Sequence, residues 1–221
     1  MRTAAVIVSA GMGRRFGAAK HEALLAGRPV LEWSLEAFHS IPDIGGIVLV
    51  LRDTARGEAL RLRFPKIISV APGGAERQDS VRSGFQELEP GGWDVVLIHD
   101  GVRPLADGRM IRRVIEAASA SGAAVPVIPV EDTLKEVAGG MVRDTLDRTR
   151  IFRSQTPQGF QYAVLKDALA EAEKAGFSGT DEAALLESMG RGVAAVPGAR
   201  SNIKITTPDD LKIAEVYLDA I

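Results

Sequence analysis

The feature that most constrains this chain is a regular alternation of short apolar, β-branched runs with amphipathic segments. Residues 4–9, 47–51 and 95–99 form three such runs, and stretches with a helical apolar pattern separate them. Strands that alternate with helices are typical of βαβ units around a mostly parallel sheet. We therefore predict an α/β, Rossmann-like fold in which helices flank a mostly parallel central sheet.

The remaining elements follow from the same periodicities and from turn residues. Helices are expected at residues 29–39, 55–63, from the glycine turn at 72–74 to about 88, from a cap at Asp107 to about 120, and from Thr207 onwards. Further strands are expected at residues 67–70, 123–129, 192–196 and 203–205. Thr207, followed by Pro208 and by Asp210, has the pattern of a capped helix start.

One segment breaks this alternation. Residues 130–146 resemble two extended stretches around Gly139-Gly140, a hairpin with little apolar surface on either strand. A two-stranded ribbon alone is barely stable in water, so we expect this β-arm, at about residues 130–150, to lean on a second subunit. With no linker or repeat, residues 1–221 are expected to form a single domain.

Composition excludes several classes of function. The net charge of −2 gives no general attraction to nucleic acid or to an anionic membrane. The absence of cysteine excludes disulfides, thiol nucleophiles and Cys-ligated metal sites, and the three histidines form no H-x-x-x-H pair. The N-terminus reaches glycine too soon for a signal peptide, and no apolar run approaches about 20 residues. We expect a cytoplasmic protein.

The loop after the first run, residues 9–20, contains three glycines together with Arg14, Arg15 and Lys20. In a doubly wound sheet, ligands bind beyond the carboxyl ends of strands, and glycines let backbone N–H groups approach phosphates. The loop matches neither the P-loop pattern nor the dinucleotide fingerprint, whose last glycine is replaced by Phe16. Three cations beside a glycine loop favour a triphosphate.

Six further motifs stand in order along the chain. They are Gly73-Gly74-Ala75-Glu76-Arg77-Gln78-Asp79-Ser80, His99-Asp100-Gly101-Val102-Arg103-Pro104, Glu131-Asp132-Thr133, Gln155-Thr156-Pro157-Gln158 with Thr180-Asp181-Glu182-Ala183, and Asn202-Ile203-Lys204-Ile205-Thr206. With the glycine loop they resemble, in order and spacing, the methylerythritol phosphate cytidylyltransferases of the non-mevalonate isoprenoid pathway, over nearly the whole chain.

That resemblance implies a Rossmann-like nucleotidyltransferase fold and a reaction in which CTP and methylerythritol phosphate give CDP-methylerythritol and pyrophosphate, with Mg²⁺ as cofactor. It implies catalytic roles for Arg15, Lys20, Arg148 and Lys204. It implies nucleotide contacts from Ala10, Gly11, Gly13, Gly74 and Ser80. It implies acceptor contacts from Asp100, which is also the candidate metal ligand, and from Arg103, Thr133, Thr156 and Thr180.

The resemblance also implies a homodimer in which the arm carries Thr133 and Arg148 into the neighbouring site. The chain departs from the family pattern at Ala19-Lys20-His21-Glu22, where the family commonly has Pro-Lys-Gln and an aromatic residue. Glu22 is therefore expected to temper the charge of Lys20. Some members carry an acid at the position of Ala75, so recognition of cytosine would rest on backbone groups here.

Alternatives remain open at this stage. Ribitol phosphate cytidylyltransferases share the chemistry and similar loops, and a nicotinamide-dependent reductase or an inactive nucleotide-binding regulator would share the fold. Single residues also have structural interpretations. Thr180, followed by Asp181 and Glu182, has the pattern of a helix N-cap, and Asp100 at a strand end is also typical of a turn.

Overall fold

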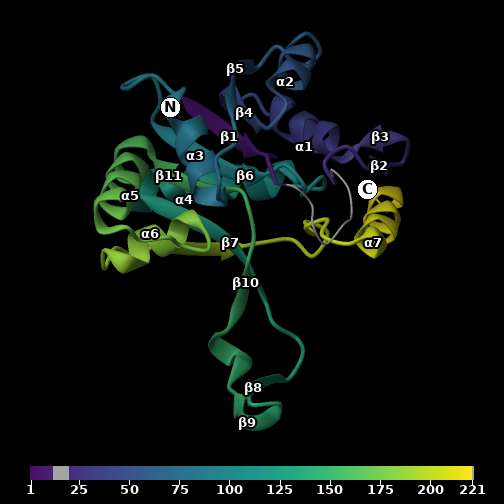
Figure 1. The fold of residues 1–221 in the computed structure, drawn as a ribbon, viewed down its shortest axis with the longest axis vertical. Coiled ribbons are helices and arrows are strands. Elements are labelled where there is room, and N and C mark those ends of the chain that lie inside the picture. Colours follow the sequence, from purple (N-terminus) through teal and green to yellow (C-terminus); the bar gives the residue numbers. More distant parts are fainter. Residues whose placement is uncertain (12–19, 221) are drawn as a thin grey trace.

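A central sheet dominates the fold (Figure 1). The computed structural model describes residues 1–11 and 20–220. Within those residues the sheet has 8 strands. They are β1 (Thr3–Val8), β4 (Ile44–Leu51), β5 (Ile67–Pro72), β6 (Val95–Asp100), β7 (Ala123–Pro129), β10 (Phe152–Ser154), β11 (Gln158–Gln161) and β12 (Ala194–Pro197). Their order is β10-β7-β11-β6-β1-β4-β5, with β12 beside β7.

The pairing confirms the expected, mostly parallel sheet. Strand β1 runs parallel to β4 and β6, β4 runs parallel to β5, and β12 runs parallel to β7. Strands β10 and β11 are antiparallel to their neighbours. Because β1, β5 and β6 are parallel, their carboxyl ends meet at one edge of the sheet, where ligands of such folds bind.

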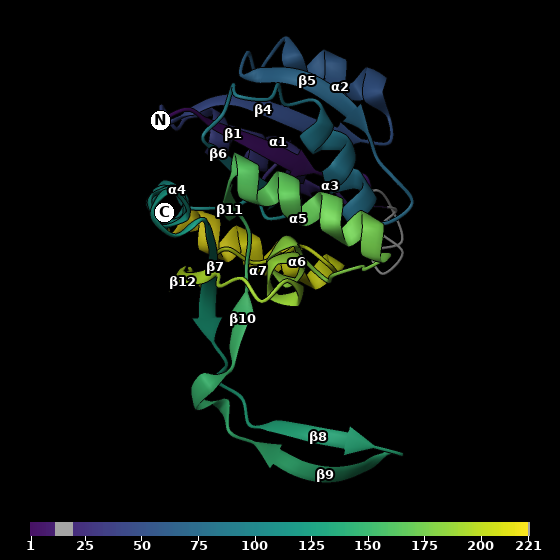
Figure 2. The same ribbon diagram turned by 90° about the vertical axis from the view of Figure 1, so that its left-hand side faces the viewer.

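Helices cover both faces of the sheet (Figures 1 and 2). The first face packs against α1 (Val30–His39), α2 (Thr54–Arg61) and α4 (Gly108–Ser121), and the second against α3 (Arg77–Gln86), α5 (Tyr162–Ala175) and α6 (Glu182–Ser188). Strand β1 serves both, since Ala5 and Ile7 face the first layer while Ala4 and Val6 face the second. Both faces are therefore buried, as the apolar run predicts.

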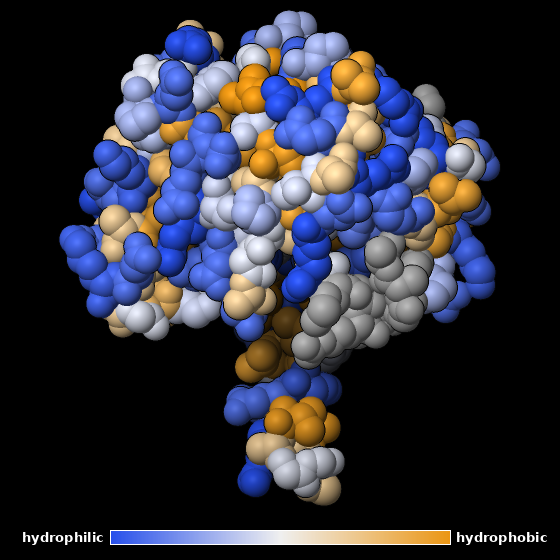
Figure 3. Space-filling view, turned by 45° about the horizontal axis from the view of Figure 1, so that its top comes forward, coloured by the Kyte–Doolittle hydropathy of each residue, from blue (hydrophilic) through white to orange (hydrophobic). Residues whose placement is uncertain are grey.

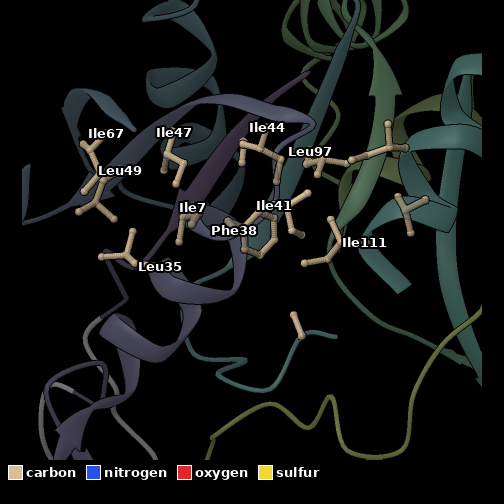
Figure 4. Packing of buried hydrophobic residues seen from close by; sticks show 14 of the residues in the cluster. Ile7, Leu35, Phe38, Ile41, Ile44, Ile47, Leu49, Ile67, Leu97 and Ile111 are labelled. Atoms are coloured by element: carbon tan, nitrogen blue, oxygen red, sulfur yellow. The ribbon is translucent and has the colours of Figure 1, made fainter. Parts of the chain in front are cut away.

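Figure 4 shows the packing of the first layer. Phe38 of α1 lies among Ile7, Ile41 and Leu97, and all four side chains are at most 2% exposed. Burying a side chain of this size stabilises a fold by about 1.5–3 kcal/mol. This layer fixes β1 and β6 relative to α1, and so fixes the sheet edge at which both strands end.

The predicted hairpin is present as β8 (Leu134–Ala138) and β9 (Met141–Leu146), followed by a short 3-10 helix, Arg148–Arg150. Gly139 and Gly140 form its turn with φ of +59° and +77°, a left-handed conformation that favours glycine. Figure 2 shows this arm projecting from the body. Its large apolar side chains, visible as apolar surface in Figure 3, are exposed; they include Val137, Met141, Val142 and Leu146.

The expected strand at residues 203–205 is wrong. These residues alternate like a strand, but they pair with none of the described strands, and the N–H of Ile205 donates instead to the carbonyl of Val102 at 2.8 Å. Ile205 is buried in a small cluster beneath α7 (Pro208–Asp219), which also packs near two short strands, β2 (Leu24–Leu25) and β3 (Arg28–Pro29). The apolar residues here pack against a loop, and they do not mark a strand of a β-sheet.

Two helix starts agree with their capping signals, those of α7 and α4. Thr207 and Asp210 form the expected capping box of α7 with Pro208 at its first position, and Asp107 caps α4. None of the described helices has both the length and the apolarity needed to cross a membrane.

Candidate active site

A hollow of about 340 Å³ opens at the sheet edge where β1, β5 and β6 end, a size typical of small-ligand sites. Its wall contains seven of the predicted site residues, namely Ala10, Gly11, Lys20, Gly74, Ser80, Asp100 and Lys204. They come from five separate parts of the chain, so the fold brings together residues up to 194 positions apart, from Ala10 to Lys204. Gly13 and Arg15 lie outside the described residues.

The two glycine loops touch beside this hollow. A Cβ on Gly73 would lie 2.1 Å from the Cβ of Ala10, and a Cβ on Gly74 would lie 2.3 Å from that of Asp79. Neither position has room for a side chain. The hydroxyl of Ser80 accepts from the Gly74 N–H at 3.0 Å and bonds to the carbonyl of Glu76 at 3.1 Å, so it holds the turn in shape.

Asp100, the last residue of β6, lies at the floor of the hollow with only 8% of its side chain exposed. Its Oδ2 accepts from Lys204 Nζ at 2.7 Å and its Oδ1 from Arg77 Nε at 3.0 Å, while Arg103 Nε lies 3.8 Å away. Burial by itself would raise the pKa of Asp100, but the charges of Arg77, Lys204 and Arg103 hold that pKa well below its usual range. The carboxylate is therefore ionised.

Arg77 joins Asp100 to a second carboxylate that the sequence does not mark as a site residue. Arg77 Nη1 lies 2.7 and 3.0 Å from the two oxygens of Glu182, whose side chain is 1% exposed. Burial would lower the pKa of Arg77, but the charges of Asp100 and Glu182 raise it, so Arg77 stays a cation. Both residues stand inside motifs of the sequence, yet only the fold reveals their contact.

His99 supports the floor of the hollow from behind. Its Nε2 lies 3.2 Å from the carbonyl of Arg103, so Nε2 donates, and its Nδ1 accepts from the Thr156 hydroxyl at 3.1 Å. The same hydroxyl accepts from the N–H of Asp100 at 3.1 Å. Burial lowers the pKa of His99 to about 3, which agrees with this neutral ring. Thr156, predicted as an acceptor contact, is buried and anchors the backbone of Asp100.

A second hollow, of about 450 Å³, adjoins the base of the arm. Arg103, Arg153, Arg200 and Lys204 line it, together with Glu131, which pairs with Arg200. Lys204 lines both hollows, so the two spaces adjoin at this residue. The excess of cations suits an anionic ligand such as a phosphate monoester.

Of the described site residues that the sequence predicts, four line neither hollow of this chain, namely Thr133, Arg148, Thr156 and Thr180. Thr133 and Arg148 are exposed on the arm. Thr180 is exposed just before α6, and its interpretation as the N-cap is wrong, because the cap is Asp181, whose carboxylate accepts from the N–H of Ala184 at 3.1 Å. The side chain of Asp181 is held at the N-cap position by a second hydrogen bond, in which Gln158 Nε2 donates to its other carboxylate oxygen at 2.7 Å.

Among the described residues, no three His, Asp or Glu side chains gather as a metal cluster. Asp100 offers a carboxylate at the floor of the first hollow. Its Oδ1 accepts from Arg77 and its Oδ2 from Lys204, and a carboxylate oxygen has two acceptor positions. A single carboxylate together with substrate phosphates is a usual environment of Mg²⁺, so these residues fit that ion.

The family model for IspD, 2-C-methyl-D-erythritol 4-phosphate cytidylyltransferase, matches residues 3–220. A protein of that name from Geobacillus thermodenitrificans is 41% identical over 99% of this chain and 97% of its own length. The crystal structure of the Thermus thermophilus protein of that name superposes with a TM-score of 0.82 at 35% identity, covering 99% of this chain and 100% of that one. The 4-diphosphocytidyl-2C-methyl-D-erythritol synthase of Anaerococcus prevotii gives a TM-score of 0.87 at 31% identity, covering 98% and 96%.

Proposed function

The chain belongs to the 2-C-methyl-D-erythritol 4-phosphate cytidylyltransferase family, and we propose that it joins CTP to 2-C-methyl-D-erythritol 4-phosphate in the hollow at the sheet edge. The family makes it a nucleotidyltransferase. The observation that carries the proposal is the meeting of Lys20, Asp100 and Lys204 in one hollow beside the glycine loops. CDP-methylerythritol, a precursor of isoprenoids, and pyrophosphate are the products.

The triphosphate would lie along the first glycine loop. Ala10 and Gly11 border the hollow directly after β1, and Lys20 lies on its wall. Gly13 and Arg15, between them in sequence, complete this part of the proposal. Gly74, on the facing loop, offers backbone groups to the base and ribose, and Ser80 holds that loop. Backbone recognition of the base does not depend on a side chain at Ala75.

The acceptor would lie where the two hollows meet. We assign Lys204 to the acceptor phosphate because it borders both hollows, and Arg103 borders the second one. We assign Thr180 to a direct contact with the acceptor, and Thr156 to the support of Asp100, whose N–H donates to the Thr156 hydroxyl. Thr133 and Arg148 are exposed on the arm, so we assign them to the site of a partner subunit.

In the reaction, an oxygen of the acceptor phosphate forms a bond to the α-phosphorus of CTP. The bond between that phosphorus and the oxygen bridging to the β-phosphorus breaks, and the electron pair leaves with pyrophosphate. A phosphate monoester is an anion at neutral pH, so no general base is needed. The task of the protein is to position two anions and stabilise the added charge, which suits Lys20, Lys204, Arg15 and Arg148.

We assign Mg²⁺ to Asp100 together with the triphosphate oxygens. The ion supplies charge neutralisation to the triphosphate when it is bound. Asp100 is suited to hold it because the carboxylate is ionised and keeps unused acceptor positions. The arm, whose apolar side chains are exposed in one chain, supports a homodimer. CTP is a cytoplasmic metabolite, so we place the enzyme in the cytoplasm.

The test is pyrophosphate release by the purified protein with Mg²⁺ and CTP, with either methylerythritol phosphate or ribitol 5-phosphate as the acceptor. We expect release with the first acceptor and not with the second. Release with ribitol 5-phosphate alone would assign the chain to the other polyol. Replacing CTP by ATP or UTP in the same assay checks that the hollow selects cytosine.

A further inference from the structure

Glu182 is a buried carboxylate that the proposed reaction does not use. It lies in the first turn of α6, its side chain is 1% exposed, and its bonded partner is Arg77 of α3. Taking a carboxylate out of water is costly unless it is paired, so a fold keeps one where its charge has an effect. The question is what the charge of Glu182 does.

The contacts of Arg77 give the answer. Its guanidinium is shared between two carboxylates, with Nε on Asp100 at 3.0 Å and Nη1 on both oxygens of Glu182. Asp100 is held in turn by Lys204 through its other oxygen, at 2.7 Å. A row of alternating charges therefore runs from α6 to the lysine that borders both hollows.

We propose that Glu182 is a positioning residue, which acts through Arg77 and Asp100 to hold Lys204 where it binds the acceptor phosphate. This inference rests on the proposed function, because it takes Lys204 as the acceptor cation. Acceptor binding would then depend on a residue that does not line the first hollow. Glu182 stands at the start of α6 and reaches the hollow only through Arg77.

The physical reason is competition for Asp100. A guanidinium prefers to bind one carboxylate with two parallel N–H bonds. While Glu182 holds Nη1 with both of its oxygens, the guanidinium is shared between two carboxylates and reaches Asp100 through Nε alone, at Oδ1, whereas Lys204 binds Oδ2. Without the charge of Glu182, Asp100 alone attracts the guanidinium, which then shifts toward this carboxylate and displaces Lys204 from its present position.

The test replaces Glu182 by glutamine, which keeps the shape and removes the charge. For Glu182→Gln we expect the acceptor KM to rise about tenfold, as for a misplaced binding group, with the CTP KM unchanged within about twofold. The matched control is Glu173→Gln, because Glu173 also pairs with an arginine of α3, Arg82 at 2.9 Å, but on the exposed surface. We expect wild-type KM values for both substrates in this control.

A double-mutant cycle separates positioning from a merely structural role. If Glu182 acts through Lys204, then Glu182→Gln should add less than about twofold to the defect of Lys204→Ala. Losses that multiply would overturn the proposal, as would an equal rise of both KM values in Glu182→Gln or a wild-type acceptor KM.

Thermal unfolding of each variant checks that the fold is kept. If Glu182→Gln does not fold, Arg77→Lys tests the same link from its centre, since an ammonium cannot bridge both carboxylates as the guanidinium does. The same rise in acceptor KM alone is then expected, and an unchanged acceptor KM would overturn the proposal. Wild-type protein and Glu173→Gln that release no pyrophosphate would instead show that the proposed function itself has failed.

Discussion

Arg56 binds Glu22 through two nitrogens, with Nε 3.3 Å from one carboxylate oxygen and Nη2 3.3 Å from the other. Arg56 also lies 3.5 Å from the buried Glu32 of α1. The departure from the family pattern after Lys20 thus has a local partner on α2. The negative charge of Glu22 therefore has a cationic partner in Arg56. That Glu22 also tempers the charge of Lys20 stays a prediction.

Replacing Glu22 by glutamine is therefore expected to have little effect on catalysis. The amide still accepts from Arg56, and half-exposed ion pairs contribute only about 0–1 kcal/mol to stability. We expect kcat and the CTP KM of Glu22→Gln to stay within about twofold of the wild type in the pyrophosphate assay. A tenfold change in either direction would show that the charge of Glu22 does act on Lys20.

Lys20 itself is expected to be essential for turnover. It lines the first hollow, and losing one charge-stabilising group typically costs about 10²–10³ in rate. Lys20→Ala should lower kcat by that factor and leave the unfolding temperature unchanged. Lys212→Ala on the exposed face of α7 is a matched control. Near-normal kcat in Lys20→Ala would remove the residue from the catalytic group.

Local signals predicted most of the frame of this fold. Strand β1, the start of α7 and the hairpin at Gly139-Gly140 each follow from periodicity, capping or turn residues close in sequence. The strand expected at residues 203–205 failed because a strand needs a neighbour, which periodicity does not report. The same limit explains why the N-cap predicted at Thr180 is wrong. Asp181 is the cap, and it is held by Gln158, a residue 23 positions away in the sequence.

The candidate site was predictable where its residues stand in motifs with a recognisable order. Lys20, Asp100 and Lys204 meet in one hollow as the resemblance implies. The pairing of Arg77 with Glu182 was not predictable, because it joins residues 105 positions apart through burial that no local pattern encodes. The role of Thr156 likewise depends on burial, because its hydroxyl is hydrogen-bonded to the His99 ring and to the N–H of Asp100 inside the protein.

The stability of the protein should depend on pH through His99. Burial lowers the pKa of His99 to about 3 in the folded state, against about 6.5 in an unfolded chain. Between these values the unfolded chain binds a proton that the folded chain does not. The free energy of unfolding therefore falls as pH falls below 6.5, by up to about 1.4 kcal/mol per pH unit for this group.

Urea unfolding at several pH values between 4.5 and 7.5 measures this slope. His99→Gln should unfold with a flatter pH dependence than the wild type, whatever its absolute stability. Burial also lowers the pKa of His21, which contributes in the same direction and stays in both proteins. Equal slopes in the two proteins would show that His99 is protonated in the folded state or does not titrate in this range.

Binding of Mg²⁺ is expected to require CTP. Three cations surround Asp100, so this carboxylate alone attracts a divalent cation poorly. Calorimetry should detect no Mg²⁺ binding to the protein alone and clear binding in the presence of CTP. EDTA should abolish pyrophosphate release, and Asp100→Asn should weaken Mg²⁺ binding to the CTP complex, whereas Asp219→Asn at the end of α7 should not. Tight Mg²⁺ binding without nucleotide would contradict this assignment.

The arm is expected to complete the site of a second subunit, and mixed dimers test this directly. Arg148 is exposed on the arm, whereas Lys204 lines the hollows of the body. Arg148→Ala and Lys204→Ala proteins should each be nearly inactive as pure dimers. In a mixed dimer, the wild-type Lys204 of one chain meets the wild-type Arg148 of the other at one site, and the second site carries both changes.

Random exchange of equal amounts makes half of the dimers mixed, so about a quarter of the wild-type activity should return. Unfolding and refolding the two variants together, with each variant alone treated in the same way as control, provides the exchange. This recovery arises only if the two residues of one site belong to different chains. If Arg148 instead served the site of its own chain, every site in the mixture would carry one change, and no activity would return.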